Sequence, residues 1–259
     1  MRKIVFIVLG IILYCIPVRS QNGWKEEGLH GYILMLKQRC HEVIETPRGY
    51  GKGAIISFCL VGNENYIFDR KGRITEKLAY DESNKLEWES TYTYESNNKA
   101  NILTKKACGS FKSQVTYIYN DLGEIIEETI YNAQGDVIDK YVHLYDEQGI
   151  NRISTSCYRV GGSLKWREVY EYDHLGNKLA YRHYDSQGNL DWYTMYKYDN
   201  LGNKIEEGSY DFFENELSYH TYEYVYDDWD NWIQQTVFSF DLNKRKYVDS
   251  IISREIIYY

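Results

Sequence analysis

The sequence predicts an all-β fold, an antiparallel meander of β-hairpin repeats with about 14–16 short strands in an elongated, twisted or rolled sheet. Three observations predict it. Turn sequences with Asp or Asn first and Gly fourth recur every 12 to 14 residues. The residues between these turns alternate in polarity, as in half-buried strands. After residue 20, no window of 12 or more residues carries a sustained helical stripe.

The first element, residues 1–20, has the features of a secretory signal peptide. Two basic residues precede 13 uncharged ones (4–16), and Val18 and Ser20 occupy the −3 and −1 positions of a cleavage site. A membrane anchor needs about 20 apolar residues, and a lipoprotein would use Cys15, which follows a bulky tyrosine. We therefore expect cleavage after Ser20 and export to the periplasm, the cell surface or the medium, with no transmembrane segment in the mature chain.

Charge and composition limit the classes of partner that the mature chain is expected to bind. Cleavage removes three basic residues and no acidic ones, so the net charge goes from −8 to −11. The sequence has no basic run of the kind that binds phosphate backbones, so we expect no nucleic-acid partner. With 28 Tyr and only 2 Pro, the composition is the opposite of a disordered chain.

The second element, residues 21–61, differs from the rest. A strand-like segment (29–44) precedes a loop with the sequence TPRGYGKG (46–53), and a second strand-like segment follows (54–60). We expect a capping hairpin here, because terminal repeats protect an edge that would otherwise be open.

Four cysteines follow the predicted cleavage site. If the first hairpin turns about residues 49 and 50, Cys40 and Cys59 lie opposite each other, within bonding reach. Hairpin register is easily misjudged by a residue, so the pairing stays open. Cys108 and Cys157 lie about 20 Å apart in an unrolled sheet, and we expect both to be unpaired.

The third element, residues 62–259, contains repeats of about 26 residues, with a closing strand at 254–259. One set of turns has Gly at positions 72, 123, 149, 176 and 202; a second set, starting at 81, 132 and 185, falls between them. Asp or Asn accepts backbone hydrogen bonds at the first position, and Gly takes the positive φ that closes a type I turn with a bulge. Each repeat is therefore a pair of strands joined by tight turns, and sequence neighbours pair in the sheet.

The alternation of residues between the turns assigns each side chain to one of the two faces of its strand. In the segment 189–198, one face carries Leu190, Trp192, Thr194, Tyr196 and Tyr198, and the other carries Asp191, Tyr193, Met195 and Lys197. In 136–145, Val137, Asp139, Tyr141, His143 and Tyr145 share a face.

The repeat motif Tyr-x-Tyr-Asp-x-x-Gly-Asn resembles the YD repeat of the bacterial RHS family. The best matches are 170–177 and 196–203, with weaker ones at 117–123 and 224–231, and the resemblance spans about residues 62–240. It implies an exported β-sheet scaffold, in some members linked to carbohydrate binding or adhesion, and in large members a β-shell around a toxin. Seven or so repeats are too few to enclose a cargo, so the toxin-delivery role is not expected.

The aromatic stripe is the feature with the greatest binding potential. Flat apolar rings with polar rims suit stacking on sugars or on a protein partner. The candidate ligand-binding residues are Trp192, Tyr196, Tyr198, Trp229 and Trp232. The alternative is that each Tyr packs across strands without a ligand. The acidic stretch 227–232 offers oxygen atoms for calcium, but it aligns with the repeat turns and is predicted to be one.

Enzyme signatures are absent from the sequence. The histidines, among them His143, His183 and His220, are dispersed, and the sequence has no nucleophile elbow, metalloprotease motif or phosphate loop. We expect no metal or cofactor. The preferred hypothesis is a non-enzymatic scaffold of the cell envelope or medium that binds a glycan or protein through an aromatic sheet face. The alternative is a carbohydrate-active enzyme with paired carboxylates on a β-scaffold.

Overall fold

The computed structural model describes residues 27–56, 62–94, 100–106, 111–120, 124–241 and 243–259. The predicted signal peptide lies outside these residues. The described part of the chain forms seventeen β-strands and no helix, which confirms the all-β meander with one strand more than the predicted range. The strands are β1 (Ile33–Thr46), β2 (Gly49–Ile55), β3 (Glu64–Phe68), β4 (Ile74–Tyr80), β5 (Leu86–Tyr94), β6 (Ala100–Lys106), β7 (Phe111–Tyr119), β8 (Ile125–Tyr131), β9 (Val137–Tyr145), β10 (Arg152–Tyr158), β11 (Leu164–Tyr172), β12 (Lys178–Tyr184), β13 (Leu190–Tyr198), β14 (Lys204–Asp211), β15 (Glu216–Tyr226), β16 (Trp232–Phe240) and β17 (Lys246–Tyr258).

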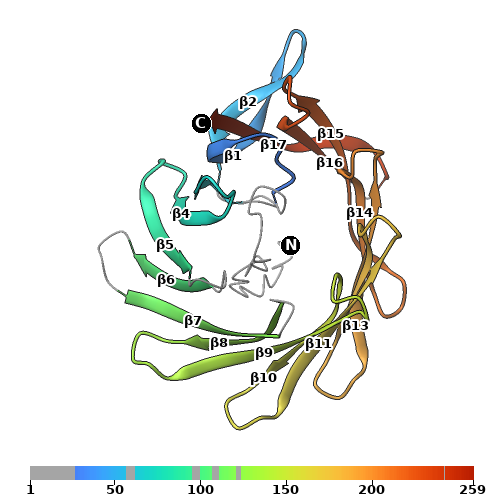
Figure 1. Cartoon of the computed structure of the whole chain (residues 1–259). Helices are drawn as coiled ribbons and strands as arrows, with labels where there is room; N and C mark the ends of the chain where they lie inside the picture. The colour runs from blue at the N-terminus through green and yellow to red at the C-terminus, as the bar shows by residue number, and fades with distance from the viewer. Residues whose placement is uncertain (1–26, 57–61, 95–99, 107–110, 121–123, 242) are drawn as a thin grey trace, which may run out of the picture.

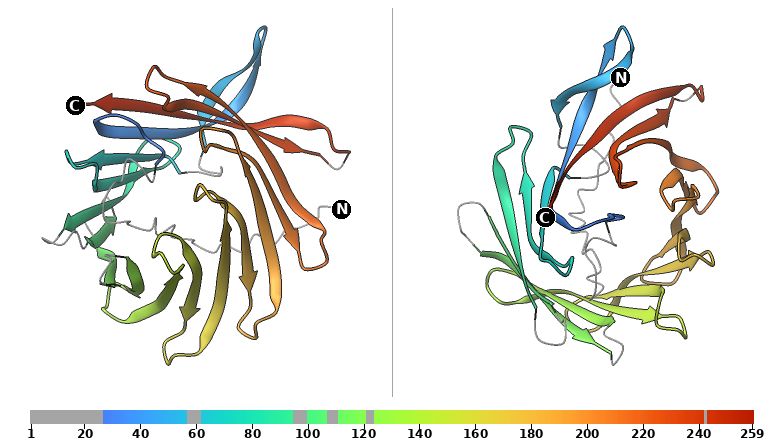
Figure 2. Two further views of the ribbon diagram at one scale, coloured as in Figure 1. Left: turned by 45° about the vertical axis from the view of Figure 1, so that its right-hand side comes forward. Right: turned by 45° about the horizontal axis from the view of Figure 1, so that its top comes forward.

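The strands follow one another around a ring (Figure 1). From β3 to β17, each strand pairs antiparallel with the next, as the turn spacing predicted. Strand β1 then joins the two ends of the meander, because it pairs with β17 on one side and with β3 on the other. Strand β2 pairs with the far part of β1, and their hairpin projects from the ring (Figure 2).

The repeat turns have the predicted chemistry. In the turn 173–177, the Asp173 carboxylate accepts hydrogen bonds from the backbone N–H groups of Leu175 (2.9 Å) and Asn177 (2.8 Å). Gly176 takes a φ of 86° and donates to the Asp173 carbonyl at 3.1 Å. Four turns place a residue other than glycine at this fourth position, also with positive φ: Asn84, Glu214, Asp230 and Lys244.

The turn of the first hairpin corrects the predicted register. Thr46 pairs with Gly49, so the hairpin turns between residues 47 and 48 rather than about 49 and 50. Pro47, with its fixed φ, and Arg48 form the two-residue loop, and Gly49 supplies the positive φ of 116° that follows it. The local chemistry of Pro47 and Gly49 therefore sets the turn, and counting inward from the two strand-like segments misplaced it.

The cysteine predictions are tested in part. Cys40 is disulfide-bonded, and its partner lies outside the described residues, as do Cys59 and Cys108. The Cys40–Cys59 pairing therefore stays a prediction. Cys157 is a buried free cysteine, as expected.

The two faces of the sheet differ in crowding. In β13, Trp192 and Thr194 lie on a face that neighbouring side chains cover, whereas Asp191, Met195 and Lys197 on the other face are exposed. Because side chains converge on the concave side of a curved sheet, the crowded face is the inner face of the ring. Two clusters of buried apolar residues lie near the junction of the ends: Leu29, Ile33, Leu36, Tyr66, Phe68 and Ile74 in one, and Cys40, Tyr222, Val237 and Ile252 in the other.

In five of the repeats, a tyrosine hydroxyl on the inner face is hydrogen-bonded to the backbone of the preceding repeat. The Tyr198 hydroxyl donates to the backbone carbonyl of Lys178, twenty residues earlier, at 2.9 Å. The same bond recurs from Tyr94, Tyr145, Tyr172 and Tyr224 to Ile74, Ile125, Arg152 and Lys204. The last tyrosine of the Tyr-x-Tyr-Asp motif therefore has a structural role in the repeats that carry Tyr172 and Tyr198.

The segment that precedes β1 is hydrogen-bonded to the turn 227–231. Asn231 is fully buried, and its side-chain amide accepts from the backbone N–H of His30 (2.6 Å) and donates to the His30 carbonyl (2.9 Å). The same amide donates to the Tyr258 hydroxyl at 2.8 Å. The turn thus holds residues on both sides of the β1–β17 junction.

Candidate functional site

A chain of hydrogen bonds crosses the inner face over strands β8 to β12. It begins at Glu128 on β8, whose carboxylate lies 2.8 Å from Nε2 of His143 on β9. Nδ1 of His143 lies 3.0 Å from the hydroxyl of Thr155 on β10. All three side chains are buried. Burial lowers the pKa of His143, although the hydrogen bond to Glu128 opposes this shift.

The chain continues through β11 and β12. The Tyr170 hydroxyl lies 3.1 Å from the Thr155 hydroxyl and donates to Glu168 at 2.5 Å, and Tyr181 donates to the other oxygen of Glu168 at 3.2 Å. Burial on its own would raise the pKa of Glu168, but the nearby His183 ring and the hydrogen bonds from Tyr170 and Tyr181 outweigh it and hold the pKa below its usual range. Glu168 is therefore an anion with both oxygens engaged.

An aromatic stack borders this chain. His183 lies between two indole rings, with its ring centroid 5.5 Å from that of Trp166 and 5.4 Å from that of Trp192. Tyr181 meets Trp192 edge to face at 4.8 Å. All four rings are half-buried and keep part of their surface exposed. We call Trp166, His183 and Trp192 the aromatic stack.

Three basic residues recur at 26-residue intervals on the same face. Arg152, Lys178 and Lys204 are the first residues of β10, β12 and β14. Each lies over a tyrosine ring: Tyr145 at 5.9 Å, Tyr170 at 4.6 Å and Tyr196 at 5.5 Å, respectively. Burial lowers the pKa of Lys178, and the charges of Arg152 and Lys204 add to this shift while Glu168 opposes it.

The structure brings three of the five predicted binding residues together. Trp192, Tyr196 and Tyr198 lie on the inner face of β13. Trp232 lies on the inner face of β16, three strands away, with the Arg254 guanidinium 3.5 Å from its ring centroid. Trp229 lies in a turn at the edge of the ring, 60% exposed.

The acidic stretch 227–232 forms a repeat turn. The Asp227 carboxylate accepts from the backbone N–H groups of Trp229 and Asn231 through one oxygen, and from the Tyr258 hydroxyl through the other. Both oxygens of the Asp227 carboxylate are therefore used in hydrogen bonds within and beside the turn. Within the described ranges, no group of three or more His, Cys, Asp or Glu side chains is placed to hold a metal ion.

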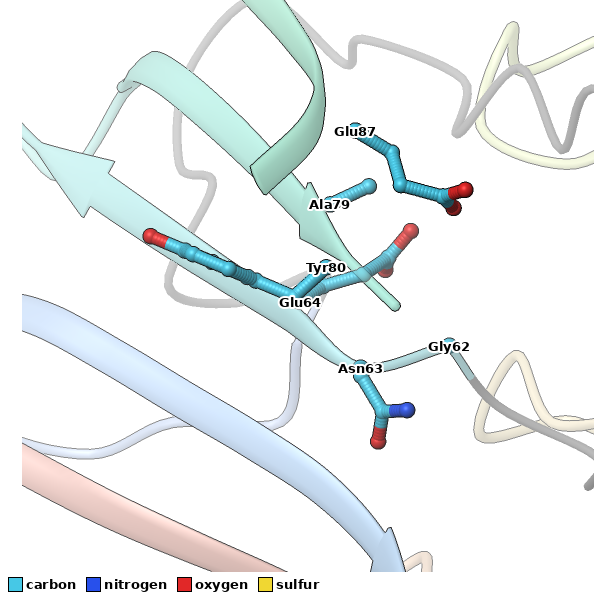
Figure 3. Close-up of a pocket in the computed structure, with 6 residues that line it drawn as sticks. All are labelled: Gly62, Asn63, Glu64, Ala79, Tyr80 and Glu87. Carbon is cyan, nitrogen blue, oxygen red and sulfur yellow. The ribbon is translucent and has the colours of Figure 1, made fainter. Parts of the chain in front are cut away.

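A pocket of about 200 Å³ lies beside β3, β4 and β5 (Figure 3). It is lined by Gly62, Asn63, Glu64, Ala79, Tyr80 and Glu87. The two carboxylates extend to the same side of the pocket in Figure 3. Glu64 is engaged by the Lys77 ammonium at 2.9 Å and by the Tyr66 hydroxyl at 2.5 Å.

Sequence reasoning missed the buried network. Residues that face each other in a regular hairpin lie at equal distances from the centre of its turn, so the predicted turn 146–149 places Arg152 opposite His143. In the structure the loop extends to Asn151 and the register shifts between Arg152 and Ser154, so Thr155 pairs with His143 instead. Alternation and turn spacing alone therefore do not bring His143 and Thr155 together.

The fold and the site together define a class: an all-β ring of hairpin repeats with a tyrosine-rich, polar inner face. No family model and no curated protein matches the sequence. No helix in the described residues has the length and apolarity needed to cross a membrane.

Solved structures do resemble the fold. A porin-like protein from Bacteroides uniformis aligns with a TM-score of 0.59 at 13% identity, over 87% of this chain and 98% of its own. A porin-like protein from Bacteroides vulgatus aligns at 0.47 and 14%, over 88% and 99%. A TcdB2-TccC3-TEV structure aligns at 0.29 and 14%, over 82% of this chain and 14% of its own. At such identities the likeness is one of fold, and the first of the three carries it.

Proposed function

We propose that the protein is an exported, non-enzymatic scaffold of the cell envelope that binds a glycan through the inner face of its ring. The export proposal rests on the signal-peptide features of residues 1–20. A ring of paired strands leaves few free edges, which suits a scaffold that works outside the cell without chaperones.

The aromatic stack is the observation that carries the glycan proposal. Trp166 and Trp192 offer flat apolar surfaces, and Glu168, Tyr170 and Tyr181 place polar atoms beside them. Sugar rings present apolar C–H faces with hydroxyl groups at their rims, so they match a surface of this kind. A protein partner would use the same rings, and we treat that as an outcome of the test.

The alternative, a carbohydrate-active enzyme, would use Glu64 and Glu87 in the pocket beside β3. A glycosidase directs both of its carboxyl groups at the substrate, one as acid and one as base or nucleophile. Glu64 is instead engaged by the Lys77 ammonium at 2.9 Å and by the Tyr66 hydroxyl at 2.5 Å. This engagement supports the non-enzymatic proposal over the enzyme.

A glycan-array screen of the exported protein tests the proposal. We expect binding by the parent, loss of most of the signal in Trp192→Ala, and an unchanged signal in Met195→Ala, which removes an exposed side chain from the outer face of the same strand. A silent array, or equal losses in the two variants, would reject the glycan. Turnover of an oligosaccharide that Glu87→Gln abolishes would favour the enzyme.

A further inference from the structure

The inner face holds hydrogen-bond donors that have no acceptor among the described residues. Arg152 and Lys178 begin β10 and β12, and Tyr170, on β11 between them, lies under the Lys178 ammonium. Nη2 of Arg152 is buried and has no hydrogen-bond partner in the described part of the chain. The Lys178 ammonium likewise makes a cation–π contact and no hydrogen bond there. Leaving a buried donor of a charged group without an acceptor is energetically costly.

The acidic side chains of this region do not supply the missing acceptors. Both oxygens of Glu168 are engaged by Tyr170 and Tyr181, and one oxygen of Glu128 lies 2.8 Å from Nε2 of His143. The charges of the two carboxylates act on the two cations, but among the described residues neither carboxylate accepts a hydrogen bond from Arg152 or Lys178. The donors left unpaired on this face therefore belong to cationic groups.

Lys204, the third of the basic residues spaced 26 residues apart, differs from the other two in having an acidic partner. Lys204 occupies the equivalent position one repeat later, but its ammonium forms an ion pair with Glu207. In the part of the chain that the structure describes, Lys178 has no such partner, so the unpaired cationic donors of the row are those of Arg152 and Lys178. Both side chains are half-buried and keep part of their surface exposed, so a ligand that reaches the inner face can contact them.

We propose that Arg152 and Lys178 form a site for an oxyanion group, a carboxylate, sulfate or phosphate, at the Tyr170 ring. Arginine offers planar paired donors that fit such groups, and lysine adds a point charge. The site deepens the proposed function, because it lies one strand from the aromatic stack and would select acidic over neutral sugars. It does not require that function, since an inorganic anion would bind by the same contacts.

Isothermal titration of the exported protein with sodium sulfate, sodium phosphate, glucuronate and glucose, at constant ionic strength, tests the site. We compare the parent with Lys178→Met and with Lys197→Met. Lys197 lies on the outer face, paired with Glu206 at 2.7 Å, and serves as the matched control. Arg152→Gln is the second variant, and thermal unfolding checks that each protein is folded.

We expect at least one anion to bind the parent and Lys197→Met equally and to bind Lys178→Met or Arg152→Gln at least tenfold more weakly. Glucuronate binding without glucose binding would identify an acidic sugar as the source of the group; binding of sulfate or phosphate alone would identify a free anion. Absence of anion binding to the parent, or equal affinity in all folded variants, would overturn the site. Loss of glucose or neutral-glycan binding in Trp192→Ala bears on the proposed function alone and leaves this test unaffected.

Discussion

The tyrosine hydroxyls that tie successive repeats allow a quantitative test of how the ring is held together. Tyr198→Phe keeps the ring and removes only the hydroxyl that donates to the Lys178 carbonyl at 2.9 Å. A neutral hydrogen bond contributes about 0.5–1.5 kcal/mol, and a carbonyl left without it adds to the loss. Because the tyrosine is half-buried and water can partly replace its hydroxyl, we expect unfolding free energy to fall by about 1 kcal/mol.

Equilibrium denaturation in urea measures this loss. The midpoint should fall while the slope stays unchanged, and the melting temperature should fall by about 2–4 °C for a chain of this size. Tyr193→Phe is the control, since Tyr193 lies on the outer face of the same strand and stacks on Tyr210 at 5.2 Å. We expect less than about 0.5 kcal/mol there. Equal losses in the two variants, or no loss in Tyr198→Phe, would refute the argument that the hydroxyl bond stabilises the ring.

Two further predictions concern the turns and the buried network. Glu214→Gly should raise the unfolding free energy by about 0.5–1 kcal/mol in thermal melts, because it relieves a φ of 64°, and a decrease would contradict this. Burial lowers the pKa of His143 below 6.5, so the unfolded chain binds the proton more tightly and stability should fall as pH drops below about 6.5. His143→Gln should flatten that part of the curve of urea midpoint against pH, and an unchanged slope would rule out His143 as its source.

Local chemistry explains what the sequence could predict. The Asp-x-x-Gly turns depend on a carboxylate and a glycine three residues apart, so Asp173 and Gly176 predict their turn without reference to the rest of the fold. Alternation then assigns Trp192, Tyr196 and Tyr198 to one face, because the side-chain period of a strand is two.

Contacts between distant segments explain what the sequence could not predict. The union of β1 with β17 depends on the accumulated curvature of fifteen intervening strands, which no short window contains. The network from Glu128 to Tyr181 requires correct registers in four successive hairpins, and an error of one residue in any of them moves a side chain to the other face.

The pairing of β1 with β17 has a consequence for the order of folding. Lys37 pairs with Glu255, more than two hundred residues later, so the ring cannot close until nearly the whole chain has emerged. Hairpins from β3 onward pair with near neighbours in the sequence and can form early. The edge of β1 that pairs with β17 stays unpaired until the last strand has formed. Until closure, the exposed edges of β1 and of the newest strand are sites for pairing with other chains. Closing this one seam therefore sets the period during which the protein is vulnerable to aggregation.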